Sequence, residues 1–195
     1  MVFYDWQNVY EGAREAFFTD ADPRPRGQID PIALGHRIAA RRVSRIPRVF
    51  GEARLYMGRP SNSRDPRTYA AHMRQCATLE RNGAVVRHRT LRYRNGVPIQ
   101  KGVDVQLAVD FIQGCIKREF EVGVMFSNDT DLVPALEAAL EIHARGGPRP
   151  EVASWRGPAG SRNRLRVGGA DLRCHWLDRD DYQSSEDARD YNIRQ

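Results

Sequence analysis

The sequence predicts an α/β domain built around a mostly parallel sheet. Short apolar runs of strand length alternate along the chain with longer segments of helical period. Asp-Pro pairs open two of those segments, as an N-cap and a first helical residue do. The length of 195 residues suffices for one hydrophobic core. We therefore expect a single domain over residues 1–180, followed by an acidic tail over 181–195 that we expect to be partly disordered.

In the first half of the chain, each expected strand is followed by an expected helix. The expected strands cover residues 1–5, 48–58 and 84–93. The expected helices cover residues 6–18, 31–43 and 65–83. Asn82-Gly83 is a helix stop, and the alternation over 84–93 is typical of a half-buried strand.

The second half continues the pattern after a hairpin. Asn95-Gly96 favours a tight turn that leads into a strand at 97–100. The expected helices cover 101–120 and 132–147, and the expected strands cover 121–127, 150–155 and, as a short element, 172–177. The segment that begins at Arg156 is rich in glycine and arginine, and we expect it to be a loop.

The charge balance is basic and is carried by arginine. The formal net charge is +6, and only Lys101 and Lys117 among the 31 basic residues are lysines. The planar guanidinium suits phosphate, so a polyanion is the first partner to consider. A GC-rich coding sequence would produce the same arginine excess without any such partner, and composition alone does not separate the two explanations.

Cysteines and apolar runs exclude several classes of protein. Cys76, Cys115 and Cys174 have no C-x-x-C spacing and no nearby histidine pair, so we expect reduced, packed thiols and no zinc site. No apolar stretch approaches the roughly 20 residues that span a bilayer, and the N-terminus does not resemble a signal peptide. We expect a cytoplasmic protein with no membrane partner.

Four aspartates occupy positions that this architecture brings together. Asp5 ends the first strand, and Asp129 and Asp131 follow the strand at 121–127. Asp104 lies in the first turn of the helix at 101–120, which the hairpin returns to the same sheet edge. Sites in such sheets form at the carboxyl ends of strands, and clustered carboxylates need a cation such as Mg²⁺.

Each aspartate also has an ordinary structural explanation. Asp5, Asp129 or Asp131 would cap the helix that follows it, and Asp104 would favour the positive end of its helix. Capping does not explain why three separate places converge. Asp110, six residues after Asp104, lies roughly 120° around the helix from it, so we expect a structural role for Asp110.

Polar and basic neighbours of the aspartates are candidate substrate ligands. Asn8 lies three residues after Asp5, where its amide would bond a metal-bound water or a substrate phosphate, or form a turn. Ser127 and Asn128 precede Asp129, where each would donate to a carboxylate or a phosphate, or form a turn. The basic candidates are Lys101, Arg92, Arg94 and the arginines of 162–166.

Three motifs, in order, resemble a known family. They are "YDWQN" at 4–8, "KGVDVQLAVD" at 101–110 and "SNDTDLVPAL" at 127–136. Each motif alone is weak, but the ordered triple is specific. It resembles the NYN domain, a branch of the PIN-like nuclease superfamily, over about residues 2–155. The resemblance implies a Rossmann-like, three-layer α/β/α sandwich.

The resemblance also implies a site and a reaction. Asp5, Asp104 and Asp129 match the family's acidic positions, which bind Mg²⁺ or Mn²⁺. Asn8 matches its asparagine, and Asp131 matches the second aspartate of the S-x-D-x-D element, as a ligand or an organiser. The implied catalytic set is therefore these five residues, and the implied substrate is RNA.

We expect a metal-dependent endoribonuclease acting on single-stranded RNA, with a homodimer left open. One alternative is an RNA-binding or regulatory module whose acidic pocket is vestigial. Another is a phosphatase of the haloacid dehalogenase type, which also begins with a strand-ending aspartate. That mechanism requires a second aspartate two residues later, where this chain has Gln7.

Overall fold

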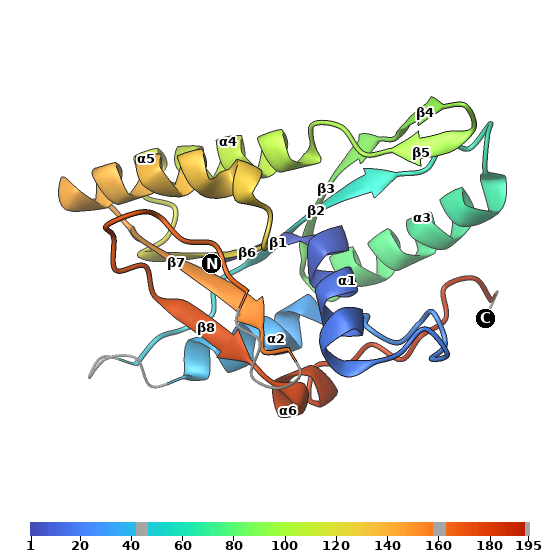
Figure 1. Cartoon of the computed structure of the whole chain (residues 1–195), viewed down its shortest axis with the longest axis horizontal. Coiled ribbons are helices and arrows are strands. Elements are labelled where there is room, and N and C mark those ends of the chain that lie inside the picture. The colour runs from blue at the N-terminus through green and yellow to red at the C-terminus, as the bar shows by residue number, and fades with distance from the viewer. Residues whose placement is uncertain (42–46, 158–162, 194–195) are drawn as a thin grey trace.

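The computed structural model describes residues 1–41, 47–157 and 163–193 and has a central sheet of six parallel strands (Figure 1). The strand order is β3-β2-β1-β6-β7-β8, and every adjacent pair is parallel. The strands are β1 (Val2–Asp5), β2 (Ala53–Arg59), β3 (Val85–Thr90), β6 (Val122–Phe126), β7 (Arg149–Trp155) and β8 (Cys174–Leu177). The predicted parallel α/β fold is confirmed.

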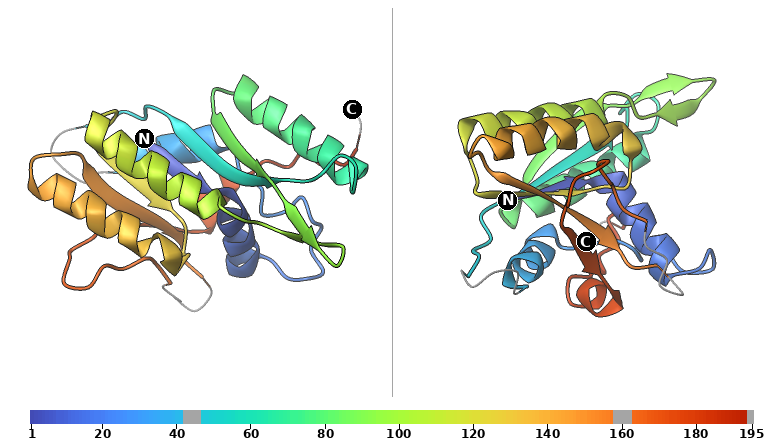
Figure 2. Two further views of the ribbon diagram at one scale, coloured as in Figure 1. Left: turned by 90° about the horizontal axis from the view of Figure 1, so that it is seen from above. Right: turned by 60° about the vertical axis from the view of Figure 1, so that its left-hand side comes forward.

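Helices cover both faces of this sheet, which gives the three-layer sandwich (Figures 1 and 2). One face carries α4 (Val103–Lys117) and α5 (Val133–Ala144), and the other carries α1 (Trp6–Phe17), α2 (Pro31–Ala40) and α3 (Pro66–Arg81). Side chains of β1 alternate between the two cores, since successive residues of a strand point to opposite faces. Val2 and Tyr4 pack in the core that includes α1 to α3, whereas Phe3 packs in the core that includes α4 and α5.

Aspartate side chains begin the first three helices, as the sequence predicts. Asp5 accepts from the Asn8 amide, Asp30 from the amides of the first turn of α2, and Asp65 from the Thr68 amide. Each carboxylate satisfies a backbone N–H group that has no partner inside its helix.

The edge of the sheet departs from the predicted elements. The prediction of a single half-buried strand over 84–93 is wrong. The segment divides at Leu91 into the edge strand β3 and the short strand β4 (Arg92–Arg94). Residues 87–90 are exposed, and none of the strands in the described ranges pairs with β3 on its outer side. The predicted hairpin is confirmed: β4 pairs with β5 (Val97–Ile99), and φ is +51° at Asn95 and +79° at Gly96.

Other boundaries shift by a few residues. The strand predicted at 48–58 begins only at Ala53, and the helix predicted at 31–43 ends at Ala40, with 42–46 outside the described residues. The predicted domain boundary at residue 180 falls inside α6 (Arg179–Gln183).

The described part of the acidic tail contacts the body of the domain. The Asp30 amide donates to the Ser185 carbonyl over 2.7 Å, and the Asp187 amide donates to the Gln28 carbonyl over 3.1 Å. The Arg74 guanidinium donates to the Tyr191 carbonyl. These bonds attach residues 185–191 to α2, α3 and the loop before them. Each helix in the described ranges is too short or too polar to span a lipid bilayer.

Candidate active site

The strand order reverses between β1 and β6. From β1 the chain moves outward to β2 and β3, and then returns to form β6 on the other side of β1. Ligands of open α/β sheets bind at such a switch point, outside the carboxyl ends of the strands. Asp5 is the last residue of β1, and Ser127 directly follows β6. The polar residues predicted from the sequence therefore lie at this position.

Three carboxylates form an acidic trio near the carboxyl end of β6, namely Asp104, Asp129 and Asp131. One oxygen from each lies within 4.8 Å of the other two. Asp104 comes from the first turn of α4, and Asp129 caps the 3₁₀ helix η1 (Thr130–Leu132), which contains Asp131. No arginine or lysine in the described ranges makes an ion pair with the trio. Three like charges thus lie together without a compensating cation, a condition that favours cation binding.

Asp5 lies outside the trio and is buried behind it, with 7% of its surface exposed. Its Oδ2 accepts a 2.9 Å hydrogen bond from Ser127 Oγ, and its Oδ1 accepts one of 3.4 Å from the Asn8 amide. Burial raises the pKa of Asp5 to about 6; the hydrogen bonds oppose this, and the charges of Asp129 and Asp104 add to it. Asp5 is therefore close enough to the trio for the charges of Asp129 and Asp104 to raise its pKa.

Hydrogen bonds to Asn8, Ser127 and Asn128 fix the loop after β6. Asn8 Oδ1 accepts from the Asn128 amide over 2.9 Å, and Ser127 Oγ accepts from the Asp129 amide over 3.0 Å. Asn128 Oδ1 accepts from Ser154 Oγ over 3.0 Å. The side-chain oxygens of these three predicted substrate ligands are thus bonded within the protein, and that of Ser127 contacts both the Asp5 carboxylate and the Asp129 amide.

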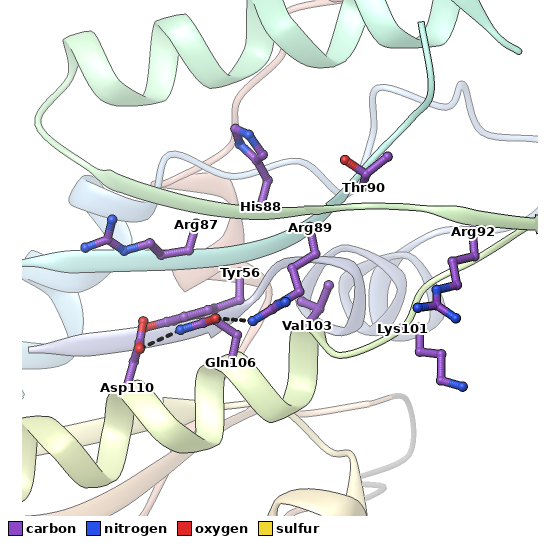
Figure 3. Close-up of a pocket in the computed structure, with 10 residues that line it drawn as sticks. All are labelled: Tyr56, Arg87, His88, Arg89, Thr90, Arg92, Lys101, Val103, Gln106 and Asp110. Atoms are coloured by element: carbon purple, nitrogen blue, oxygen red, sulfur yellow. Dashed lines mark hydrogen bonds between the residues drawn. The ribbon is translucent and has the colours of Figure 1, made fainter. Parts of the chain in front are cut away.

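A basic pocket of about 690 Å³ lies between β3 and α4 (Figure 3). Its cationic residues are Arg87, Arg89, Arg92 and Lys101. Two of these, Arg92 and Lys101, were predicted as substrate ligands, whereas the equally predicted Arg94 does not line the pocket. The sequence prediction missed Arg87 and Arg89, although alternate arginines in "VVRHRT" place both on one face of a strand.

The basic pocket borders the acidic trio at the start of α4. Val103 lines the pocket, and the next residue, Asp104, belongs to the trio. Asp110, also in the pocket, accepts hydrogen bonds from Tyr56 Oη over 3.0 Å and from Gln106 Nε2 over 2.7 Å. The structural role expected for Asp110 agrees with these contacts.

The arginines of 162–166 do not line the basic pocket where they are described. Arg164 Nη1 donates a 2.5 Å hydrogen bond to the Leu172 carbonyl, which holds the loop before β8. Arg162 lies outside the described residues.

The donor chemistry of the trio fits a hard divalent cation. All of its ligand atoms are carboxylate oxygens, which Mg²⁺ and Mn²⁺ prefer. Mg²⁺ usually binds through one or two carboxylates and keeps several waters, so an open, partly exposed trio can hold it.

Comparison with protein families matches residues 1–145 to the NYN domain. Neither the search of curated proteins nor that of solved structures gives a match. The matched span contains Asp5, the acidic trio and the whole basic pocket. NYN domains are typically nucleases of the PIN-like superfamily that act on RNA. This chain belongs to the NYN domain family.

Proposed function

We propose that the chain is a ribonuclease that depends on Mg²⁺ or Mn²⁺ and cleaves single-stranded RNA endonucleolytically. The observation that carries this proposal is the unpaired acidic trio bordered by a pocket with four cationic side chains. A carboxylate cluster alone binds a cation, and an arginine pocket alone binds a polyanion. Side by side, they suit a phosphodiester substrate.

In this proposal Asp104, Asp129 and Asp131 hold the cation, and the buried Asp5 adds negative charge behind them. When bound, the ion supplies charge stabilisation to the scissile phosphate and makes a water molecule more acidic. Asp129 is held on both sides, since its amide donates to Ser127 and its Oδ1 accepts from the Asp131 amide over 3.0 Å. This rigid support favours a fixed ligand geometry.

The proposed RNA path runs through the basic pocket. Arg92 and Lys101 are exposed and lie at the two ends of the hairpin segment. Arg92 would therefore contact the RNA from β4, and Lys101 would contact it from the loop that precedes α4. Arg89 Nη2 donates to Gln106 Oε1 over 2.6 Å, which orients its guanidinium in the pocket. These groups would bind the phosphates of the RNA and would not distinguish one base from another.

The test is cleavage of end-labelled single-stranded RNA by the purified chain with Mg²⁺ or Mn²⁺, compared with the same reaction in EDTA. Asp129→Asn should lose cleavage while keeping the fold, because asparagine still caps η1. The matched control is Asp20→Asn, an exposed aspartate in the loop after α1, which should cleave normally. Full activity in Asp129→Asn or in EDTA would contradict the proposal.

A second candidate function is an RNA-binding module without cleavage. It is favoured by the capping bond of Asp129 to η1, which gives this carboxylate a structural role that needs no metal. This candidate predicts salt-sensitive RNA binding that persists in EDTA and in Asp129→Asn, with intact RNA recovered after long incubation with Mn²⁺. Measuring binding and cleavage on the same RNA separates the two functions.

A further inference from the structure

Two histidines and a cysteine meet between α3 and β3, and one of them, His88, also lines the basic pocket. His72 and Cys76 lie one turn apart on α3, and His88 lies on the edge strand β3. One ligand atom from each lies within 4.8 Å of the other two. The fold therefore brings a histidine pair to a cysteine although the sequence spacing does not indicate a zinc site. An i, i+4 pair on a helix faces one direction, and the sheet brings His88 to it across the fold.

The donor set is soft and open to solvent on one side. Cys76 is buried at 2% exposure, His72 is half-buried and His88 is exposed. Cys76 Sγ lies 3.3 Å from His72 Nε2 and 3.7 Å from Met57 Sδ, so a thioether adjoins the thiol. Imidazole and thiolate are ligands of Zn²⁺ and of copper, whereas Mg²⁺ prefers oxygen.

The charges around this cluster are mixed. Arg59 Nη1 lies 2.9 Å from His88 Nε2, and since a guanidinium only donates, this nitrogen is the acceptor. The same arginine also donates to Thr90 Oγ1 over 2.9 Å. Glu80, one turn after Cys76 on α3, supplies a negative charge near Cys76 and His88. A metal that uses Nε2 of His88 must displace Arg59, whereas one that uses Nδ1 need not.

We propose that His72, Cys76 and His88 form a second metal site, which takes a thiolate-preferring ion of the Zn²⁺ class. Water completes the coordination. Binding releases the thiol proton of Cys76 to solvent, because only the thiolate is a ligand. This site is separate from the acidic trio in both place and chemistry, so it does not depend on the proposed nuclease activity.

Such a metal would act on the strand that carries two of the pocket arginines. His88 and Thr90 point to the α3 side of β3, while Arg89 points to α4 (Figure 3). Among the described strands, β3 pairs only with β2 and has no partner beyond it. A bond between α3 and His88 would therefore hold the edge strand that positions Arg87 and Arg89 in the basic pocket.

The experiment is titration of the reduced chain with Co²⁺ in excess Mg²⁺, followed by competition with Zn²⁺. A thiolate-bound Co²⁺ gives a near-ultraviolet charge-transfer absorption that carboxylate sites cannot give. We expect one such ion per chain, displaced by one equivalent of Zn²⁺. The absorption should be lost in Cys76→Ser and lost or strongly weakened in His88→Ala, whose exposed position spares the fold.

The controls are matched by residue type. His143→Ala removes an exposed histidine on α5, and Cys115→Ser removes a buried thiol on α4, and both should keep the absorption. Asp129→Asn should keep it too, which separates this site from the acidic trio. Arg59→Gln should bind Zn²⁺ more tightly if Nε2 is the ligand and equally if Nδ1 is. Absence of the charge-transfer band in the wild-type chain, or its survival in Cys76→Ser, would overturn the proposal.

Discussion

Ser127 Oγ donates a 2.9 Å hydrogen bond to Asp5 Oδ2 and so joins the residue after β6 to the last residue of β1. The same hydroxyl accepts from the Asp129 amide over 3.0 Å. One fully buried side chain therefore links the carboxylate behind the site to the backbone of an aspartate of the trio. This link requires both neighbouring strands in register.

Ser127→Ala should lower the free energy of unfolding by about 1–3 kcal/mol, because it leaves a buried carboxylate and a backbone amide without their partner. Cleavage should fall as well, since Asp129 loses its support. Urea unfolding measures the first effect. Ser63→Ala, which removes an exposed hydroxyl, should stay within about 0.5 kcal/mol of wild type. Equal stabilities for the two variants would mean that the buried bond contributes nothing.

The pKa of Asp5 predicts how stability depends on pH. In the metal-free native state Asp5 keeps its proton to about pH 6, whereas its ordinary pKa is 3.8. Between pH 3.8 and about pH 6 the native state thus binds more protons than the unfolded state. The stabilisation from this proton is complete below the unfolded-state pKa and is lost as the pH rises through the native-state pKa. The loss amounts to at most ~3 kcal/mol.

Asp5→Asn tests this dependence, because asparagine has no proton to lose. The difference in unfolding free energy between Asp5→Asn and wild type should grow in favour of the mutant from about pH 4 to about pH 7 in EDTA. Saturating Mg²⁺ should reduce that gain, since a cation compensates the charge of the wild-type carboxylate. Parallel pH profiles for the two proteins would contradict the raised pKa.

The basic pocket predicts a salt-dependent effect on RNA binding. Lys101→Ala and Arg92→Ala should each weaken binding of single-stranded RNA and reduce the slope of log K against log salt by about 0.7, as expected for the loss of one phosphate contact. The variants should raise KM more than they lower kcat. Arg145→Ala, an exposed arginine at the end of α5, is the matched control and should leave the slope unchanged.

The fold was accessible from the sequence because its signals are local. Asp30-Pro31 and Asp65-Pro66 mark helix starts whose capping bonds depend only on the next few residues. Apolar runs such as 122–126 predict buried strands without knowledge of their neighbours. Misplaced boundaries fall where long-range pairing decides, as at Leu91, where the chain leaves the sheet for the hairpin.

The candidate site was accessible only in part. The motifs predicted Asp5, Asp104 and Asp129 as metal ligands and Asp131 as a ligand or an organiser, but not that Asp5 would be buried outside the trio with both oxygens bonded. The cluster of His72, Cys76 and His88 joins a helix to an edge strand, and no short spacing encodes that approach. The H-x₃-C spacing on α3 was a weak signal, because a cysteine and a histidine one helical turn apart commonly just pack.

Asp131 provides the sharpest test of which carboxylates hold the cation. Its amide donates to Asp129, but none of the described residues donates a hydrogen bond to its carboxylate, which is exposed and lies in the trio. A capping role therefore explains Asp129 and not Asp131. Asp131→Asn should leave the free energy of unfolding in EDTA within about 0.5 kcal/mol of wild type.

Metal affinity should respond differently from stability in this variant. Loss of one charge from the trio should weaken Mn²⁺ binding about tenfold, a modest fraction of the interaction between charges about 4 Å apart near a protein surface. Calorimetric titration with Mn²⁺ measures this affinity, and Glu137→Gln, which removes an exposed carboxylate from α5, is the control. Unchanged Mn²⁺ affinity in Asp131→Asn would restrict the carboxylate ligands to Asp104 and Asp129.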